Sequence, residues 1–442
     1  MLKIPPIIIC LILFSFNISA NDAENTVPIF RIDAKNKSGT EIGIVLGKAI
    51  KEKFPQVAQK YDSYLAENLD QKTFEEWAQK ISFLISNIDP IYQDEVNAIV
   101  SSWVMSSRDH LGDGHLSAHE FWIFQLMPEI QQGIHGSGFG VFGKASASGS
   151  PIVGRNLDWK TTEALRSLQA ITVYEYDDKA VVNIGFAGYA GVMSGFNHQG
   201  LFGAFLDSPT GIRYSNSPKS QHIIAFELRK ALETSSNIPN VEERLNQQQY
   251  HSSHNILLAD QKRVAVLEQS QGFDTQLRTD VSPLKTETLW KKPHQIAVVN
   301  CFALKSLPSN CIKSIDFFQW HRFKTLAQFN SLNNKAHVQD IMNVMLDTFN
   351  MNPYQKVFNQ NTVQSMVFTP QDQKLYLYTQ PVSGIHETNP VMHEIRQQSL
   401  FSMIPQKWPF QNLFLIVGIL LLIGVLIYGN YPILIKKYKK NQ

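Results

Sequence analysis

The apolar residues of this chain follow two different spacings, and the change between them predicts two structurally different parts. Between residues 40 and 127 apolar side chains recur every three or four positions, which is the spacing of helices with one buried face. After Trp159 the pattern changes to short runs rich in β-branched and aromatic residues, such as 170–176 and 180–184, separated by Gly, Asp or Asn. We therefore expect a helical segment followed by a β-rich part.

Helical spacing returns in three later stretches, at residues 221–233, 315–329 and 338–348. Helices mixed with antiparallel strands are typical of a layered α+β domain. We expect one such domain over residues 137–400, and no internal repeat interrupts it.

The run from Ser137 to Trp159 predicts a β-hairpin that carries two charged residues near its end. Two apolar strands flank a small-residue turn around Gly149, so the second strand returns beside Ser137. Arg155 and Asp158 lie in that second strand. A buried charge without a partner lowers the stability of the fold by several kcal/mol. Each therefore needs a partner, either a reactive centre, which we favour, or a structural ion pair.

Several segments resemble, in order, those of one enzyme superfamily. They are Gly-Arg-Asn-Leu-Asp at 154–158, Gly-Phe-Asn-His-Gln-Gly-Leu at 195–201, Asn255 to Asp260, Val-Asn-Cys-Phe at 299–302, and the strand pair 362–368 and 375–378. The pattern resembles N-terminal-nucleophile hydrolases of the choloylglycine hydrolase, acid ceramidase and acyl-CoA:isopenicillin N acyltransferase (peptidase C45) type. The resemblance implies a four-layer αββα fold, in which two antiparallel sheets lie between two helical layers.

The chain departs from this family at the nucleophile, because the Cys that begins the first strand is absent. An ungapped alignment places Gly136 at the Cys position, and shortening by one residue makes Ser137 the nucleophile. A Ser at a new N-terminus can be activated by its own α-amine, which titrates near neutrality. We therefore predict self-cleavage between Gly136 and Ser137, with residues 21–136 remaining bound as a helical α-chain.

The resemblance also assigns roles to four further residues. Asn197 and Asn255 would donate hydrogen bonds to the oxyanion, Asp158 would orient the α-ammonium, and Arg155 would hold the nucleophile region or the developing charge. The alternative for Asn197 is a turn residue, and for Asn255 a strand-end residue.

Two functions of different class fit these residues. One is hydrolysis of a linear, non-peptide N-acyl amide or lipid-like small molecule, or transfer of its acyl group, and Phe139 and Phe142 would suit an acyl chain. The other is a catalytically silent relative that keeps the fold as a binding or structural protein. Loss of the Cys favours the second, and retention of the four site residues favours the first.

Both ends of the chain predict export and membrane attachment. Residues 1–20 have a charged start, a short apolar core and a small-residue end, as in a secretory signal peptide. Residues 410–435 are long and apolar enough to span a bilayer, and 436–442 form a Lys-rich tail that fits the cytoplasmic side. The main domain would then lie outside the cytoplasm.

Removal of the signal peptide would leave Cys301 and Cys311, which an oxidising compartment could join in a disulfide that braces a loop near the site. Two free, buried thiols are the alternative.

Net charge and motif content give no support for two classes of partner, nucleic acids and metal ions. A net charge of +2, without a stripe of Lys and Arg in the main domain, gives no reason to expect nucleic acid. The His- and Asp-containing run from Asp109 to Glu120 matches no metal-ligand signature. We therefore expect neither a metal nor a cofactor.

Overall fold

The structure is a computed structural model, and it describes residues 27–103, 108–131, 135–208, 221–288, 290, 292–310, 335–347 and 356–401. The predicted signal peptide, Cys311, the predicted helix at 315–329, the predicted span at 410–435 and the basic tail lie outside these residues. Within the described ranges, no helix combines the length and the apolar character needed to cross a membrane.

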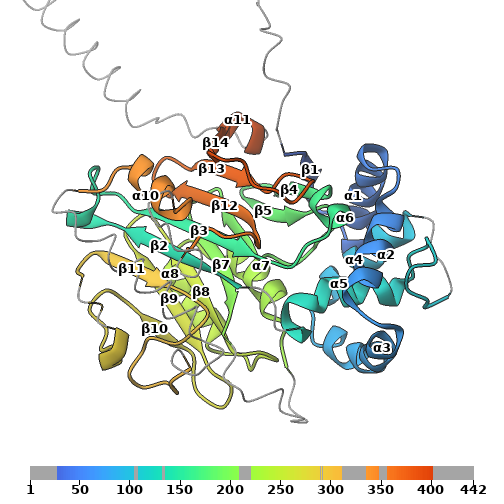
Figure 1. Cartoon of the computed structure of the whole chain (residues 1–442), viewed down its shortest axis with the longest axis horizontal. Helices are drawn as coiled ribbons and strands as arrows, with labels where there is room; N and C mark the ends of the chain where they lie inside the picture. Colours follow the sequence, from blue (N-terminus) through green and yellow to red (C-terminus); the bar gives the residue numbers. More distant parts are fainter. Residues whose placement is uncertain are drawn as a thin grey trace, which may run out of the picture.

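Helical spacing in the first part of the chain corresponds to five helices, gathered on one side of the molecule (Figure 1). They are α1 (Gly39–Lys53), α2 (Val57–Asn68), α3 (Gln71–Ile85), α4 (Pro90–Ser101) and α5 (Ala118–Ile130). Capping residues mark several starts, because Ser38 and Ser117 form capping boxes, and Asp70 and Asp89 accept from the first turn.

The larger sheet has eight strands in the order β1-β4-β5-β6-β7-β8-β9-β10. They are β1 (Ile29–Asp33), β4 (Gln169–Glu175), β5 (Ala180–Phe186), β6 (Ser194–Asn197), β7 (Phe202–Asp207), β8 (His254–Ala259), β9 (Val264–Gln269) and β10 (Gln276–Arg278). Neighbours are antiparallel except for β1 and β4, which run parallel.

The smaller sheet has six strands in the order β11-β2-β3-β12-β13-β14, all antiparallel. They are β11 (Gln295–Val298), β2 (His135–Val141), β3 (Ile152–Asp158), β12 (Thr362–Thr369), β13 (Lys374–Thr379) and β14 (His393–Ile395). The predicted closing strand pair is thus β12 and β13.

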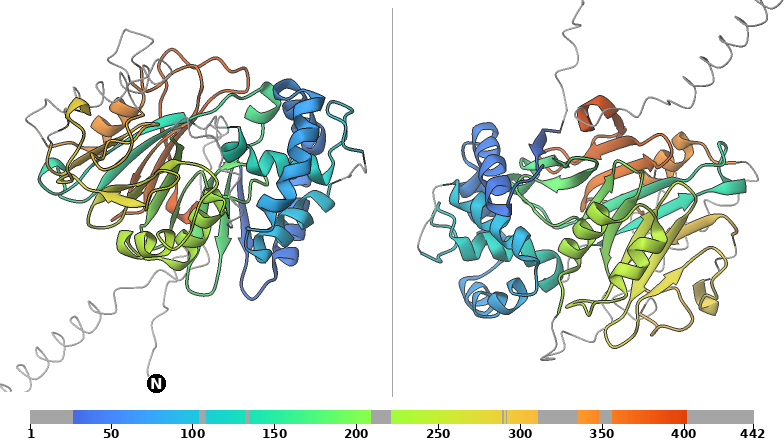
Figure 2. Two further views of the ribbon diagram at one scale, coloured as in Figure 1. Left: turned by 90° about the horizontal axis from the view of Figure 1, so that it is seen from below. Right: turned by 180° about the vertical axis from the view of Figure 1, so that it is seen from behind.

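The two sheets pack face to face, with helices on both outer faces (Figure 2). Residues such as Val153, Phe196 and Leu257 fill the space between the sheets. The larger sheet is covered by α7 (Ile224–Thr234), with α8 (Ile238–Leu245) packed beside it, and the smaller sheet by α10 (Val338–Met345). The predicted α+β class is confirmed, and the layers follow the order helix, sheet, sheet, helix.

A buried ion pair joins the helical segment to the β-rich part. The carboxylate of Glu95 in α4 lies 2.8 Å from Nη2 of Arg229 in α7, and both side chains are almost fully buried. Tyr174 in β4 donates to Glu95 at 2.8 Å, and its ring lies 3.9 Å from the guanidinium carbon of Arg229. These contacts connect residues on either side of the predicted cleavage point without using the covalent chain.

Replacing Glu95 by Ala tests the importance of this connection. The change leaves the buried Arg229 cation with one carboxylate, that of Glu233 at 3.0 Å from Nε, in place of two. We expect the free energy of unfolding to fall by about 3 kcal/mol, the lower end of the cost of breaking a buried ion pair. Urea unfolding followed by fluorescence measures the difference. The control is Asp177→Ala, which breaks a surface pair with Lys35 and should leave the midpoint unchanged. Equal midpoints for Glu95→Ala and the wild type would contradict the prediction.

Candidate active site

Strands β2 and β3 form the predicted hairpin, and their register places the start of β2 beside the end of β3. Ser137 lies opposite Asn156, and His135 lies opposite Asp158. Short 3₁₀ helix η1 (Gly143–Ala145) lies in the connection between the strands. The start of β2 therefore lies beside the charged end of β3, as the sequence pattern predicts.

Gly136 lies so close to Arg155 that position 136 has no room for a side chain. Its φ of 146° is a conformation that favours glycine. A Cβ built on Gly136 would fall far inside van der Waals contact with Nη1 of Arg155 and the carbonyl oxygen of Asn156. A side chain at position 136 would therefore point at Arg155. In this arrangement only Gly fits at that position.

Arg155 is a fully buried cation whose described hydrogen bonds go to neutral carbonyl groups. Its Nη1 donates to the carbonyl of Asn156, and its Nη2 donates to the carbonyl of Phe205 in β7 at 2.8 Å. Among the described residues, nothing accepts from its Nε. Burial lowers the pKa of Arg155 to about 9, while the nearby Asp158 opposes that shift. The guanidinium thus keeps its charge at neutral pH and retains an N–H for another acceptor.

Ser137 faces the opposite side of the smaller sheet. Side chains alternate along a strand, so Ser137 shares its face with Phe139, which packs in the cluster that contains Met345 of α10. Its cross-strand neighbour Asn156 donates to the carbonyl of Met345 at 2.6 Å, which also places this face toward α10. The Ser137 hydroxyl is buried, and no described group forms a hydrogen bond with it.

Asp158 is held by two donors at the end of β3. Thr362 donates from Oγ1 to Oδ1 at 2.6 Å, and Asn359 donates from Nδ2 to Oδ2 at 2.9 Å. The side chain is only 2% exposed. Two oriented donors fix the carboxylate close to the start of β2.

Asn300 is the residue that joins the larger sheet to the start of the hairpin. Its Oδ1 accepts from the backbone N–H of Gly136 at 2.9 Å, and its Nδ2 donates to the carbonyl of Asp207 at 2.6 Å. Asn300 belongs to the family-like segment 299–302 but was not among the expected site residues. Its position in that segment was the signal that could have identified it.

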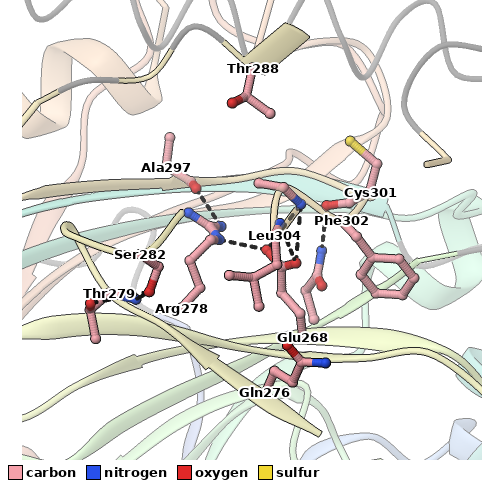
Figure 3. Close-up of polar contacts among 12 residues, drawn as sticks. Glu268, Gln276, Arg278, Thr279, Ser282, Thr288, Ala297, Cys301, Phe302 and Leu304 are labelled. Carbon is pink, nitrogen blue, oxygen red and sulfur yellow. Dashed lines mark hydrogen bonds and ion pairs between the residues drawn. The ribbon is translucent and has the colours of Figure 1, made fainter. Parts of the chain in front are cut away.

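The loop that carries Asn300 is braced on both sides. Asn255 donates from Nδ2 to the carbonyls of Val299 and Cys301, both at 2.9 Å. Glu268 accepts from the backbone N–H groups of Ala303 and Leu304, and Arg278 bridges Glu268 to the carbonyl of Ala297 (Figure 3). Both Nδ2 hydrogens of Asn255 are used in these bonds, so in this arrangement it supports Asn300 and has no N–H left for an oxyanion.

Asn197 lies away from this group. Its Nδ2 donates to the carbonyls of Leu232 and Ser235 at the end of α7, at 2.9 and 2.8 Å. Its Oδ1 accepts from the backbone N–H groups of Gln199 and Leu201, which form the turn before β7. The structure therefore brings Arg155, Asp158, Asn255 and the start of β2 together, but not Asn197, whose contacts are those of the alternative turn role.

Cys301 forms a disulfide. The predicted partner, Cys311, lies outside the described residues, so this pairing stays a prediction. Cys301 directly follows Asn300, and a disulfide there restrains the loop that carries the Asn300 side chain.

The stability of the protein should depend on pH through Asp207, the last residue of β7. Burial raises its pKa to about 8, and one of its carboxyl oxygens has no hydrogen-bond partner in the described part of the chain. Between about pH 4 and pH 8 the folded chain keeps a proton that the unfolded chain releases, so this group lowers stability as pH rises through that window. We expect Asp207→Asn to raise the urea midpoint relative to wild type near pH 8 and to lose this advantage near pH 4.

The control for this comparison is Asp177→Asn, at a half-exposed carboxylate whose removal should give the same offset from wild type at both pH values. An Asp207→Asn offset that does not change with pH would contradict the prediction.

Comparisons with solved structures give several matches at low sequence identity. A Caenorhabditis elegans N-acylethanolamine-hydrolyzing acid amidase ortholog is 18% identical, with a TM-score of 0.38, and covers 53% of this chain and 92% of its own. A conjugated bile acid hydrolase from Clostridium perfringens is 14% identical, with a TM-score of 0.39, covering 60% and 92%. Penicillin V acylase from Agrobacterium tumefaciens is 11% identical, with a TM-score of 0.35, covering 59% and 86%. No curated protein matches the chain.

The comparison with protein families gives a longer match. The family model described as acyl-coenzyme A:6-aminopenicillanic acid acyl-transferase matches residues 145–381, which is more than half of the chain. The match contains β3 with Arg155 and Asp158, and it begins after Gly136 and Ser137. This chain therefore belongs to the acyl-coenzyme A:6-aminopenicillanic acid acyl-transferase family, which is part of the N-terminal-nucleophile hydrolase superfamily.

Proposed function

We propose that this protein is an exported, membrane-anchored amidohydrolase or acyltransferase that acts on a linear N-acyl amide through Ser137, after cleaving its own chain between Gly136 and Ser137. The observation that carries the proposal is the Ser137 hydroxyl, which is buried and has no hydrogen-bond partner among the described residues. Ser137 directly follows Gly136, whose positive φ favours glycine. A hydroxyl without a partner is available to attack the neighbouring carbonyl.

The cleavage step requires only the chain itself and water. Oγ of Ser137 attacks the carbonyl carbon of Gly136, the C–N bond breaks, and the nitrogen becomes the α-amine of Ser137. Water then hydrolyses the resulting ester, which leaves a carboxylate on Gly136 and a free hydroxyl on Ser137. The hydrogen bond from Gly136 N–H to Asn300 holds the peptide in place before the attack.

Cleavage also removes the constraint that keeps Ser137 on the α10 face. A strand residue cannot turn its side chain to the other face, but an N-terminal residue is bonded on one side only. Departure of Gly136 opens the space beside Nη1 of Arg155, which in the uncut chain is too narrow for a Cβ. The freed Ser137 can then turn its hydroxyl toward Arg155.

The same groups serve the reaction on the substrate. Ser137 attacks the amide carbonyl, its α-amine takes the hydroxyl proton and gives it to the leaving amine, and an acyl ester remains. The N–H that Arg155 retains would stabilise the oxyanion, and Asp158 would orient the α-ammonium. Water completes a hydrolysis, and an amine completes an acyl transfer. The family description and the named hydrolases support an N-acyl amide as the substrate class.

One observation favours a second candidate function, a binding protein that has kept the fold without the chemistry. Position 136, which faces Arg155, carries a glycine, whereas Ser137 faces the other side of the sheet. If the chain is never cut, Ser137 stays on the opposite side of the sheet from Arg155 and cannot serve as a nucleophile there.

Replacing Ser137 by Ala separates the two candidates. We expect the wild-type protein, purified from membranes, to give a second N-terminus at Ser137, and the variant to give one uncut chain, because Ala has no hydroxyl to attack Gly136. Intact mass and N-terminal sequencing measure the outcome.

The matched control is Ser194→Ala, since Ser194 is another buried strand serine whose hydroxyl has no described partner. That variant should be cut like the wild type. An uncut wild-type chain would rule out the Ser137 mechanism and leave the binding protein as the better account.

The location belongs to the same proposal and rests on the sequence alone. Residues 1–20 have the layout of a signal peptide, residues 410–435 could span a bilayer, and four lysines follow. A domain held at the non-cytoplasmic surface of the membrane would meet lipid-like amides there.

Thiol labelling tests this topology. We expect a membrane-impermeant maleimide to label Ile385→Cys in intact cells, because Ile385 is 76% exposed on the main domain. Asn441→Cys, in the basic tail, should react only after the membrane is permeabilised. Labelling of Asn441→Cys in intact cells would contradict the proposed orientation.

A further inference from the structure

We propose that His386 and Tyr378 are positioning residues for Asp158 and act on it through Asn359. The inference rests on the proposed function, in which Asp158 orients the α-ammonium of Ser137. Tyr378 lies in β13, and His386 follows in the loop between β13 and β14. Tyr378 ends the family-like segment 375–378, but neither Tyr378 nor His386 was among the expected site residues.

The connection consists of three successive hydrogen bonds. Tyr378 Oη lies 3.0 Å from Nδ1 of His386, and Nε2 of His386 lies 3.0 Å from the carbonyl oxygen of Asn359. The side chain of the same Asn359 then donates from Nδ2 to Asp158 at 2.9 Å. The loop after β13 therefore reaches the Asp158 carboxylate through one intervening residue.

The partners determine which nitrogen of His386 carries its proton. A carbonyl oxygen can only accept, so Nε2 must be the donor toward Asn359, and Nδ1 is then the acceptor for the Tyr378 hydroxyl. Burial lowers the pKa of His386 and raises the pKa of Tyr378 to about 12, so a neutral imidazole faces a protonated phenol at neutral pH. Tyr378 thus selects the tautomer that can hold Asn359.

Asn359 is held by several hydrogen bonds, so the position of His386 determines the position of the side chain that donates to Asp158. Its carbonyl also accepts from the backbone N–H of Thr362 at 2.9 Å, and its Oδ1 accepts from the N–H of Asn361 at 2.9 Å. Thr362 is the second donor to Asp158. The turn from Asn359 to Thr362 therefore presents both donors to the carboxylate, and His386 fixes one end of that turn.

Aromatic packing keeps the imidazole in place. The ring of Phe358 lies 4.6 Å from the ring of His386 and 5.5 Å from that of Tyr378, measured between centroids. These contacts come from the residue directly before Asn359. The three rings form one unit beside the turn, so loss of the His386 donor should loosen the turn while the packing partly remains.

The test measures acylation of Ser137 in the full chain by a serine-directed β-lactone probe, which requires no knowledge of the substrate. His386→Leu removes the donor to Asn359, and we expect the maximal acylation rate to fall about tenfold or more because Asp158 is misplaced. The half-saturating probe concentration should stay the same. His386→Gln, whose side-chain amide can donate from a similar place, should recover most of the rate.

Tyr378→Phe is the milder variant and decides the question if His386→Leu does not fold. It removes the hydroxyl that selects the tautomer, so we expect a several-fold lower maximal rate at the same half-saturating concentration. His393→Leu, at an exposed histidine in the neighbouring strand β14, is the control and should match the wild type.

Each remaining outcome overturns a stated claim. Wild-type rates in His386→Leu and Tyr378→Phe, or a His386→Gln variant as slow as His386→Leu, would overturn the positioning role and leave the proposed function intact. A wild-type protein whose Ser137 is not acylated at all would overturn the proposed function and this inference with it.

Discussion

The close approach between Gly136 and the buried guanidinium of Arg155 is the constraint on which the site depends. It requires a glycine at the start of β2, because a Cβ would collide with Arg155 and with the carbonyl of Asn156. Strand alternation then sends the next side chain, Ser137, to the α10 face. In the uncut chain the Ser137 hydroxyl is therefore separated from the cation by the sheet, and breaking the Gly136–Ser137 bond would remove that separation.

The surrounding structure is suited to a chain that is cut at this point and stays together. The ion pair between Glu95 and Arg229 joins α4 to α7 across the proposed cleavage site, and both side chains are buried. The groups around the hairpin come from both sheets, since Arg155 reaches Phe205 in β7 and Asn300 holds the N–H of Gly136. Loss of one covalent bond would leave these contacts in place.

The sequence predicted the fold well where local pattern determines structure. Spacing of apolar residues identified the helical segment, and the turn around Gly149 identified the β2–β3 hairpin, because both depend on short-range geometry. The faces of β2 and the partners of the Asn residues depend on contacts between distant strands. For that reason the bonds of Asn197 to α7, and the place of Asn300 beside Gly136, could not be deduced from spacing alone.

A crystal structure of the protein purified from membranes tests the central claim most directly. The account predicts that the chain containing β2 begins at Ser137, with its hydroxyl turned toward Arg155 and close to its own α-amine. A continuous chain through Gly136 and Ser137, with the Ser137 hydroxyl still packed toward α10, would contradict it. That result would mean that the family fold is kept here without a nucleophile beside Arg155.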